Sequence, residues 1–169
     1  MRYFLDTEFL EDDKHIELVS LGLVGQDGRE FYACNLDADL GRVARDDWMR
    51  ANVLPELPPW SDPAWMDRVH MRTAIQRFFY PHGTLAHPMP ATAPTEFWAY
   101  YGASDWVAFY QLMGGKLLGL PKEWPKWFHE LKQLCVDKGN PKLPDKPGGH
   151  HALRDARWNA SVHHFLTAT

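Results

Sequence analysis

The sequence predicts a mixed α/β fold, because antiparallel strand patterns come first along the chain and helices follow a further strand later. Three apolar runs with polar boundaries lie within the first 36 residues, whereas residues 96–166 continue with a strand-like run followed by helical patterns. The chain has 169 residues, of which 45% are hydrophobic and 24% are charged. These values are typical of one globular domain with a substantial core, and we expect a single domain over residues 1–169.

The first three strands are expected at residues 2–9, 16–25 and 30–36, with the sequences "RYFLDTEF", "IELVSLGLVG" and "EFYACNL". Only "QDGR" separates the second strand from the third, and its Asp-Gly pair is a strong hairpin signal. We therefore expect an antiparallel meander at the start of the chain.

Residues 41–95 are less regular. Two helices are expected at residues 42–54 and 63–79, "RVARDDWMRANVL" and "PAWMDRVHMRTAIQRFF". The proline-rich segments 55–63 and 81–95 bracket the second helix. We interpret them as connections within the domain.

A fourth strand is expected at residues 96–102, "EFWAYYG". A helix should follow over residues 104–114, with Ser104 as its N-cap and the pair Gly114 and Gly115 at its end.

Two more helices are expected, at residues 128–139 and 151–166. Gly139 should stop the first of them. The second shows an apolar stripe at helical spacing, formed by Leu153, Ala156, Val162 and Phe165.

Cysteine content and hydropathy predict a soluble cytoplasmic protein. Cys34 and Cys135 lie far apart without CxxC spacing, which favours buried free thiols in a reducing compartment. The N-terminus has no basic segment followed by a long apolar stretch, and no apolar run reaches the roughly 18 residues of a membrane span.

The formal net charge of −4 argues against a protein that coats long stretches of nucleic acid. The charge is uneven, however, because residues 1–115 carry −8 and residues 116–169 carry +4. A protein that holds only the end of a strand needs few phosphate contacts, so a small basic margin would suffice. Ordinary solvated lysines are the alternative explanation.

Two carboxylates interrupt the first strand. Asp6 and Glu8 lie inside an apolar run, where an unpaired charge is costly to bury. Side chains of a strand alternate between faces, so Asp6 and Glu8 point the same way, about 6.6 Å apart along the strand, while Thr7 points the other way. This arrangement indicates a bound cation. The alternative is a solvated strand end before the polar "LEDDK".

Two further acids lie at structurally meaningful positions. Asp105 is in the first turn of a helix, where an acid also complements the helix dipole. Asp155 lies in the last helix beside Arg154 and Arg157, so a surface ion pair is its simpler interpretation. His150 precedes Asp155 by five residues.

Together, these residues resemble the DEDDh (DnaQ-like) family of 3′-5′ exonucleases. "FLDTEF", "YYGASDWVAF" and "HHALRDA", with its H-x4-D spacing, are similar to the three motifs of that family. The resemblance runs from residue 3 to about residue 166 and is weakest over 41–95. "DTEF", "WAYYGASD" and "HHALRDARWN" are most similar to the short exoribonucleases of the ribonuclease AS type.

The resemblance implies a ribonuclease H-like fold, with a mixed five-stranded sheet whose first three strands are antiparallel and which helices flank. It also implies removal of nucleoside monophosphates from the 3′ ends of single-stranded, adenine-rich RNA by two Mg²⁺ or Mn²⁺ ions. The implied metal ligands are Asp6, Glu8, Asp105 and Asp155. Ribonuclease H endonucleases share the fold, but their Glu comes from a helix, so the strand pair of Asp6 and Glu8 favours an exonuclease.

Two adjacent histidines compete for the role of general base. Helical geometry slightly favours His151, which lies four residues before Asp155, whereas the family spacing selects His150 on the flexible "PGG" approach to the helix. We take His150 as the base. His163 and His164 are expected at the surface or in packing.

The candidate substrate contacts are Phe9, Tyr101 and Ser104. Phe9 follows the acids of the first strand and would stack on a terminal base, unless it packs in the core. The family's habit suggests a homodimer, for which Trp48, Trp60 and Trp65 offer an interface. An exonuclease acting on DNA, or on both nucleic acids, is the alternative function. A binding module with a structural cation is a third, but it has no use for a base histidine.

Overall fold

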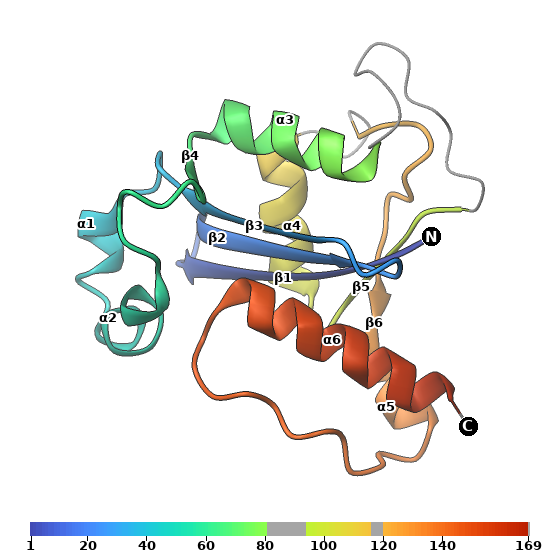
Figure 1. The fold of residues 1–169 in the computed structure, drawn as a ribbon. Coiled ribbons are helices and arrows are strands. Elements are labelled where there is room, and N and C mark those ends of the chain that lie inside the picture. Colours follow the sequence, from blue (N-terminus) through green and yellow to red (C-terminus); the bar gives the residue numbers. More distant parts are fainter. Residues whose placement is uncertain (81–93, 116–119, 169) are drawn as a thin grey trace.

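The computed structural model contains a six-stranded mixed sheet with helices on both faces (Figure 1). It describes residues 1–80, 94–115 and 120–168. The strand order is β4-β3-β2-β1-β5-β6, so β1 is a central strand. The fold class is therefore as the sequence predicts, with six strands in place of the expected five.

The expected antiparallel meander is confirmed, and three shorter strands extend it. In chain order the strands are β1 (Arg2–Glu11), β2 (Ile16–Gly25), β3 (Glu30–Asn35), β4 (Trp65–Met66), β5 (Glu96–Ala99) and β6 (His129–Glu130). β4, β5 and β6 each pair parallel to a neighbour, namely β3, β1 and β5. The two-residue strands β4 and β6 lie in segments that the sequence predicts as helical.

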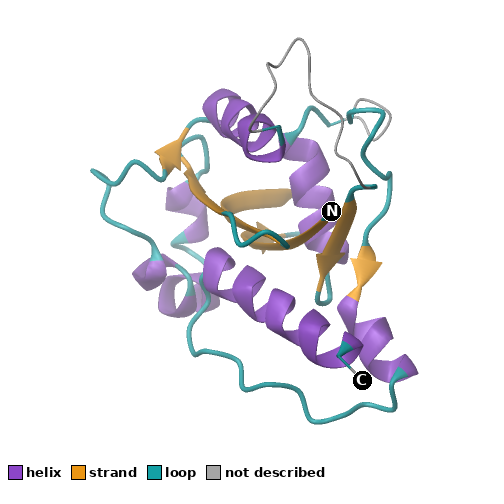
Figure 2. Cartoon of the chain, turned by 45° about the vertical axis from the view of Figure 1, so that its right-hand side comes forward, coloured by secondary structure: helices purple, strands orange, loops and turns teal. Residues whose placement is uncertain are grey.

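The described part of the chain forms seven helical segments around the sheet. They are α1 (Leu40–Val43), α2 (Asp47–Asn52), the 3₁₀ turn η1 (Leu54–Glu56), α3 (Arg68–Phe79), α4 (Ala103–Leu112), α5 (Leu131–Asp137) and α6 (Ala152–Thr167). α3 and α4 cover one face of the sheet and α6 covers the other (Figure 1). The loop that precedes α6 runs back along this helix (Figures 1 and 2). Within the described residues, no helix is both long enough and apolar enough to cross a membrane.

Several predicted helix boundaries are wrong because side chains cap the helices elsewhere. The helix expected over 42–54 is divided into α1, α2 and η1, and the Asp46 carboxylate accepts from the Met49 N–H at the start of α2. The helix expected from residue 63 begins only at Arg68, because Asp67 caps it. The helix expected from residue 128 begins at Leu131, after β6. Most of the proline-rich segment 81–95 lies outside the described residues.

Ser104 is not the N-cap of α4. Gly102 occupies that position, and a Cβ there would lie 2.3 Å from the Ala99 Cβ. The Ser104 hydroxyl instead donates to the Glu11 carboxylate at 3.2 Å. The strand expected over 96–102 ends at Ala99, and the backbone reverses through Tyr101, whose φ is +55°.

The buried face of α6 differs by one residue from the expected stripe at its end. Phe165 is exposed, whereas Leu166 is buried. The buried face also contains polar residues; in full it consists of Ala152, Asp155, Ala156, Asn159, Val162, His163 and Leu166. Polar residues on the buried face of a helix require partners, and these partners lie at the candidate site.

Two close contacts fix α6 across the sheet. Gly22 of β2 lies under the first turn of the helix, where a Cβ would be 2.4 Å from the Ala152 carbonyl carbon and 2.5 Å from the Leu153 Cα. One helical turn beyond Asp155, the Asn159 side-chain amide donates to the Leu5 carbonyl of β1 at 2.9 Å. Asp155 lies between these two contacts and is therefore held over the middle of the sheet.

Replacing Gly22 by Ala should separate α6 from β2. Because the added methyl group meets backbone atoms, we expect the free energy of unfolding to fall by about 2 kcal/mol in urea titrations with EDTA. Gly148→Ala is the matched control, since a Cβ there has no neighbour within 4 Å. Equal stability of the two variants would contradict the close packing of α6 on Gly22.

Candidate active site

The candidate site is built on β1, whose alternating side chains serve two faces of the sheet. Leu5 belongs to the core under α3 and α4, whereas Phe4 packs against Ala156 of α6. Because strand side chains alternate, Asp6 and Glu8 share the face of Phe4 and lie toward α6. Glu8 does lie on this side, because its ligand atom is within 4.8 Å of those of Asp155 and His150.

Thr7 connects β1 to α4. The parallel pairing of β1 with β5 covers only Arg2 to Phe4, so it does not reach the Thr7 N–H. This N–H and the Thr7 hydroxyl both donate to Oδ1 of Asp105, at 2.7 and 2.6 Å. Asp105 is buried in the first turn of α4, where the helix dipole also favours a negative charge. Burial nevertheless dominates and raises the pKa of Asp105 to about 6.

Asp155 reaches the same region from α6. Ligand atoms of Glu8, His150 and Asp155 lie within 4.8 Å of one another. Oδ2 of Asp155 is 3.1 Å from the Lys146 ammonium, and Oδ1 is buried without a hydrogen-bond partner among the described residues. The interpretation of Asp155 as part of a surface ion pair is wrong, because Arg154 pairs with Glu56 and Arg157 pairs with Glu30.

Electrostatic interactions show that the four acids form one cluster. Burial raises the pKa of Asp6 well above its ordinary value, and the charges of Asp105, Asp155 and Glu8 raise it further. Burial also raises the pKa of Glu8 to about 8, with a smaller contribution from Asp155. Lys146 opposes both shifts. In this arrangement the charged state of the cluster requires compensation by a cation.

The two adjacent histidines point to different places. The His150 ring lies edge-on to Trp48 of α2, with 4.6 Å between the ring centroids, and its nitrogen is close to Glu8 and Asp155. The His151 ring stacks on Tyr32 of β3 at 4.4 Å. Burial lowers the pKa of His151. The geometry thus brings His150, rather than His151, to the acids.

The segment that carries α1, α2 and η1 holds the His150 loop from outside. It packs on β2 through its own small core, in which Val43, Met49 and Val53 contact Val19. From this base, Trp48 contacts His150 and the Glu56 carboxylate accepts from Arg154. No local signal in the sequence marks Trp48 or Glu56 as neighbours of the site, because their partners lie about 100 residues away in the chain.

The predicted substrate contacts occupy distinct environments. Tyr101 is 66% exposed at the turn before α4, and Glu130 holds this turn by accepting the N–H groups of Tyr101 and Gly102. Phe9 is partly buried, next to a register shift between β1 and β2 at Glu8. Ser104 is engaged by Glu11. The roles of Tyr101, Phe9 and Ser104 in substrate binding stay predictions.

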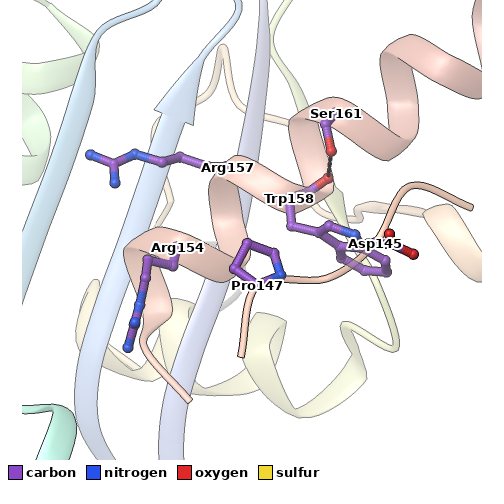
Figure 3. Close-up of a pocket in the computed structure, with 6 residues that line it drawn as sticks. All are labelled: Asp145, Pro147, Arg154, Arg157, Trp158 and Ser161. Atoms are coloured by element: carbon purple, nitrogen blue, oxygen red, sulfur yellow. Dashed lines mark hydrogen bonds between the residues drawn. The ribbon is translucent and has the colours of Figure 1, made fainter. Parts of the chain in front are cut away.

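A surface pocket of about 270 Å³ lies beside α6, next to the loop that precedes it (Figure 3). It is lined by Asp145, Pro147, Arg154, Arg157, Trp158 and Ser161. None of the four clustered acids lines this pocket. The side chains of Arg154 and Arg157 extend away from Trp158 (Figure 3), toward their partners Glu56 and Glu30. The pocket is therefore separate from the acid cluster.

The residues of the cluster fit divalent metal ions. Carboxylate oxygens are the preferred ligands of Mg²⁺ and Mn²⁺, and four carboxylates with one imidazole converge here. No donor among the described residues reaches the buried Oδ1 of Asp155, which is costly for a carboxylate unless a cation contacts it. The arrangement can thus hold cations beside a histidine that is placed to exchange a proton.

Comparison with known proteins places this site in context. The family described as "3'-5' exoribonuclease Rv2179c-like domain" matches residues 1–167. The chain is similar to two curated proteins of Mycobacterium tuberculosis, "3'-5' exoribonuclease Rv2179c" of strain ATCC 25618 / H37Rv and "3'-5' exoribonuclease MT2234.1" of strain CDC 1551 / Oshkosh. Each is 41% identical over 170 residues, which cover 100% of this chain and 95% of the relative. The similarity therefore includes the less regular segment 41–95.

The clustered acids predict an unusual pH dependence of stability without metal. Burial raises the pKa of Glu8 to about 8 in the folded protein, whereas an unfolded chain restores the ordinary pKa of about 4.3. The folded state therefore binds more protons, and stability should fall as pH rises, by about 2 kcal/mol between pH 6.5 and 8.5 in EDTA. Histidines with lowered pKa values act in the opposite direction, but their contribution is complete by about pH 7.5, so the fall above that pH belongs to the acids.

Urea titrations at several pH values across this range should show that the free energy of unfolding falls less steeply with pH in Glu8→Gln than in the unchanged protein. Glu11→Gln, on the same strand, is the control and should keep the slope of the unchanged protein. Saturating Mg²⁺ should remove the fall, because the ion stabilises the ionised acids. A stability that is flat or rising from pH 7.5 to 8.5 in EDTA would contradict the raised pKa values of the clustered acids.

Proposed function

The chain belongs to the Rv2179c-like family and is a 3′-5′ exoribonuclease, and from this premise we propose that it releases nucleoside monophosphates from the 3′ ends of single-stranded RNA, with adenine-rich RNA as the substrate class. We propose further that the site is of the DEDDh type and works with two Mg²⁺ or Mn²⁺ ions. The observation that carries this proposal is the convergence of four acids and one histidine from β1, α4, α6 and the loop before α6.

In this proposal Asp6, Glu8, Asp105 and Asp155 hold the two ions. When bound, the ions supply positive charge to the leaving 3′ oxygen and lower the pKa of the attacking water. The acids come from β1, α4 and α6, so regular secondary structure sets the positions of their backbones. Thr7 contributes by fixing Asp105 through two hydrogen bonds, which leaves the other carboxylate oxygen of Asp105 available.

His150 is the proposed general base. An imidazole nitrogen can take the proton of the attacking water and pass it to solvent. Contact with Trp48 supports the position of the ring, and the stacking of His151 on Tyr32 anchors the following residue. The base thus belongs to a loop that is held at both sides.

Tyr101, Phe9 and Ser104 are the proposed contacts to the terminal nucleotides. The exposure of Tyr101 beside the turn that leads to Asp105 supports its role, because an exposed aromatic ring can stack on a base. A DNA or mixed-specificity exonuclease is the alternative, since recognition of the 2′-hydroxyl depends on groups that are not identified. The homodimer and the cytoplasmic location remain predictions.

The proposal predicts stepwise shortening of RNA from one end. We expect 5′-labelled oligo(A) with Mg²⁺ or Mn²⁺ to give a ladder of products one nucleotide apart, and DNA of the same sequence to be cut more slowly. A 3′ phosphate should slow the reaction sharply. Asp155→Asn and Glu8→Gln should abolish it, whereas Asp145→Asn, in the loop before α6, should not. Cleavage of a circular single-stranded RNA would refute an exonuclease.

The two adjacent histidines should differ in their effect on turnover. His150→Ala should lower single-turnover cleavage of oligo(A) by about 10²-fold or more, the usual effect of losing a general base. His151→Ala should act mainly on stability, because it removes the ring that stacks on Tyr32. His164→Ala, at an exposed position, is the control.

The pH profile separates a base from a structural histidine. With Mg²⁺ saturating, the acidic limb of the profile from pH 5.5 to 9 should disappear in His150→Ala alone. Its disappearance in His151→Ala instead would transfer the role to that residue.

A further inference from the structure

Lys146 is the cation nearest to Asp155 in the described part of the chain. Its ammonium lies 3.1 Å from Oδ2 of Asp155, whose side chain is only 3% exposed, while the Lys146 side chain is 43% exposed. The lysine therefore reaches from solvent into the buried cluster. The sequence contains no signal for this contact, because Lys146 lies in a loop rich in lysine, proline and glycine.

The ammonium compensates only part of the cluster. One positive charge stands opposite Asp6, Glu8, Asp105 and Asp155, and Oδ1 of Asp155 still lacks a partner among the described residues. Divalent ions bring more charge and contact carboxylate oxygens at shorter distances, about 2.0–2.1 Å for Mg²⁺. The cluster is thus better matched by divalent ions than by the lysine.

Lys146 also has a second partner outside the cluster. Its ammonium lies 5.5 Å from the centroid of the Trp158 ring, within the range of a cation–π contact. Trp158 lines the surface pocket beside α6 together with Asp145 and Pro147 (Figure 3). These two residues flank Lys146 in the sequence. A lysine that leaves Asp155 can therefore keep the contact with Trp158.

The loop around Lys146 is anchored on both sides of it. On one side, the Pro144 carbonyl accepts from the Trp158 indole N–H at 3.0 Å. On the other, Gly149 has a φ of +87°, and a Cβ there would lie 2.8 Å from the Glu56 carboxylate and 3.0 Å from the Arg154 guanidinium. Because the backbone is fixed at Pro144 and Gly149, the Lys146 side chain can move without displacing His150.

We infer that Lys146 is a tethered counterion of the acid cluster, which a divalent cation at Asp155 displaces, so that this lysine sets the metal affinity of the site. The inference rests on the proposed function in one respect, the role of the acids as metal ligands. An ammonium and a divalent ion on the same carboxylate repel each other, and the binding of one weakens the binding of the other. Lys146 thereby keeps the metal-free protein stable and makes the metal exchangeable.

The direct test is to titrate the protein with Mn²⁺ in the absence of RNA. The free Mn²⁺ is measured by its electron paramagnetic resonance signal. Lys146→Gln should tighten binding about tenfold, within the 5–150-fold range typical of coupled sites. Lys146→Arg should stay close to the unchanged protein because it keeps the charge. Lys142→Gln, at an exposed position of the same loop, is the matched control and should change nothing.

Thermal unfolding supplies an independent readout. In EDTA, Lys146→Gln should melt at a lower temperature than Lys142→Gln, and the difference should vanish at saturating Mn²⁺. Equal Mn²⁺ affinity of the Lys146→Gln variant and the unchanged protein, with or without a raised KM for RNA, would overturn the inference while leaving the proposed function intact. Failure of the unchanged protein to bind Mn²⁺ at a site that Asp155→Asn removes would instead overturn the proposed function, and the inference with it.

Discussion

The mutual repulsion of four clustered carboxylates, three of them buried, is the constraint on which the rest of this structure depends. Glu8, Asp105 and Asp155 are buried, and both burial and repulsion raise the pKa of Asp6. Such a cluster does not assemble unless the surrounding fold supplies stability. The fold supplies it through a large apolar core under α3 and α4 and through the packing of α6 on the opposite face. The acid cluster is thus destabilising by itself, and the rest of the fold offsets this cost.

Each element next to the cluster contributes contacts that stabilise one or more of the acids. α4 directs its N-terminal turn at β1, so that Thr7 and the helix dipole stabilise the charge of Asp105. α6 comes close to β2 because Gly22 has no side chain, and Asn159 fixes the helix to β1. Lys146 partly balances the charge of Asp155. These contacts explain why the acids come from strands and helices, whose geometry withstands repulsion better than a loop would.

His150 is positioned in a different way from the four acids. His150 lies in a loop, and the segment 40–56 contacts that loop through Trp48 and, beside Gly149, through Glu56. This segment gives the least regular part of the sequence a physical role, because it supports the loop without contributing an acid to the cluster. His150 is thus held by packing, whereas the four acids are held by strands and helices.

The sequence by itself determined the features that depend on local periodicity. The meander, the common face of Asp6 and Glu8, and the position of Asp155 on the last helix follow from spacings within one element. Tertiary structure alone decided the rest: the two-residue strands β4 and β6, Gly102 rather than Ser104 at the start of α4, and the burial of Leu166 rather than Phe165. It also decided the contacts of Asp105 with Thr7 and of Asp155 with Lys146. These outcomes depend on groups from separate elements that meet only when the sheet has formed, and the periodicity of a single segment carries no information about such partners.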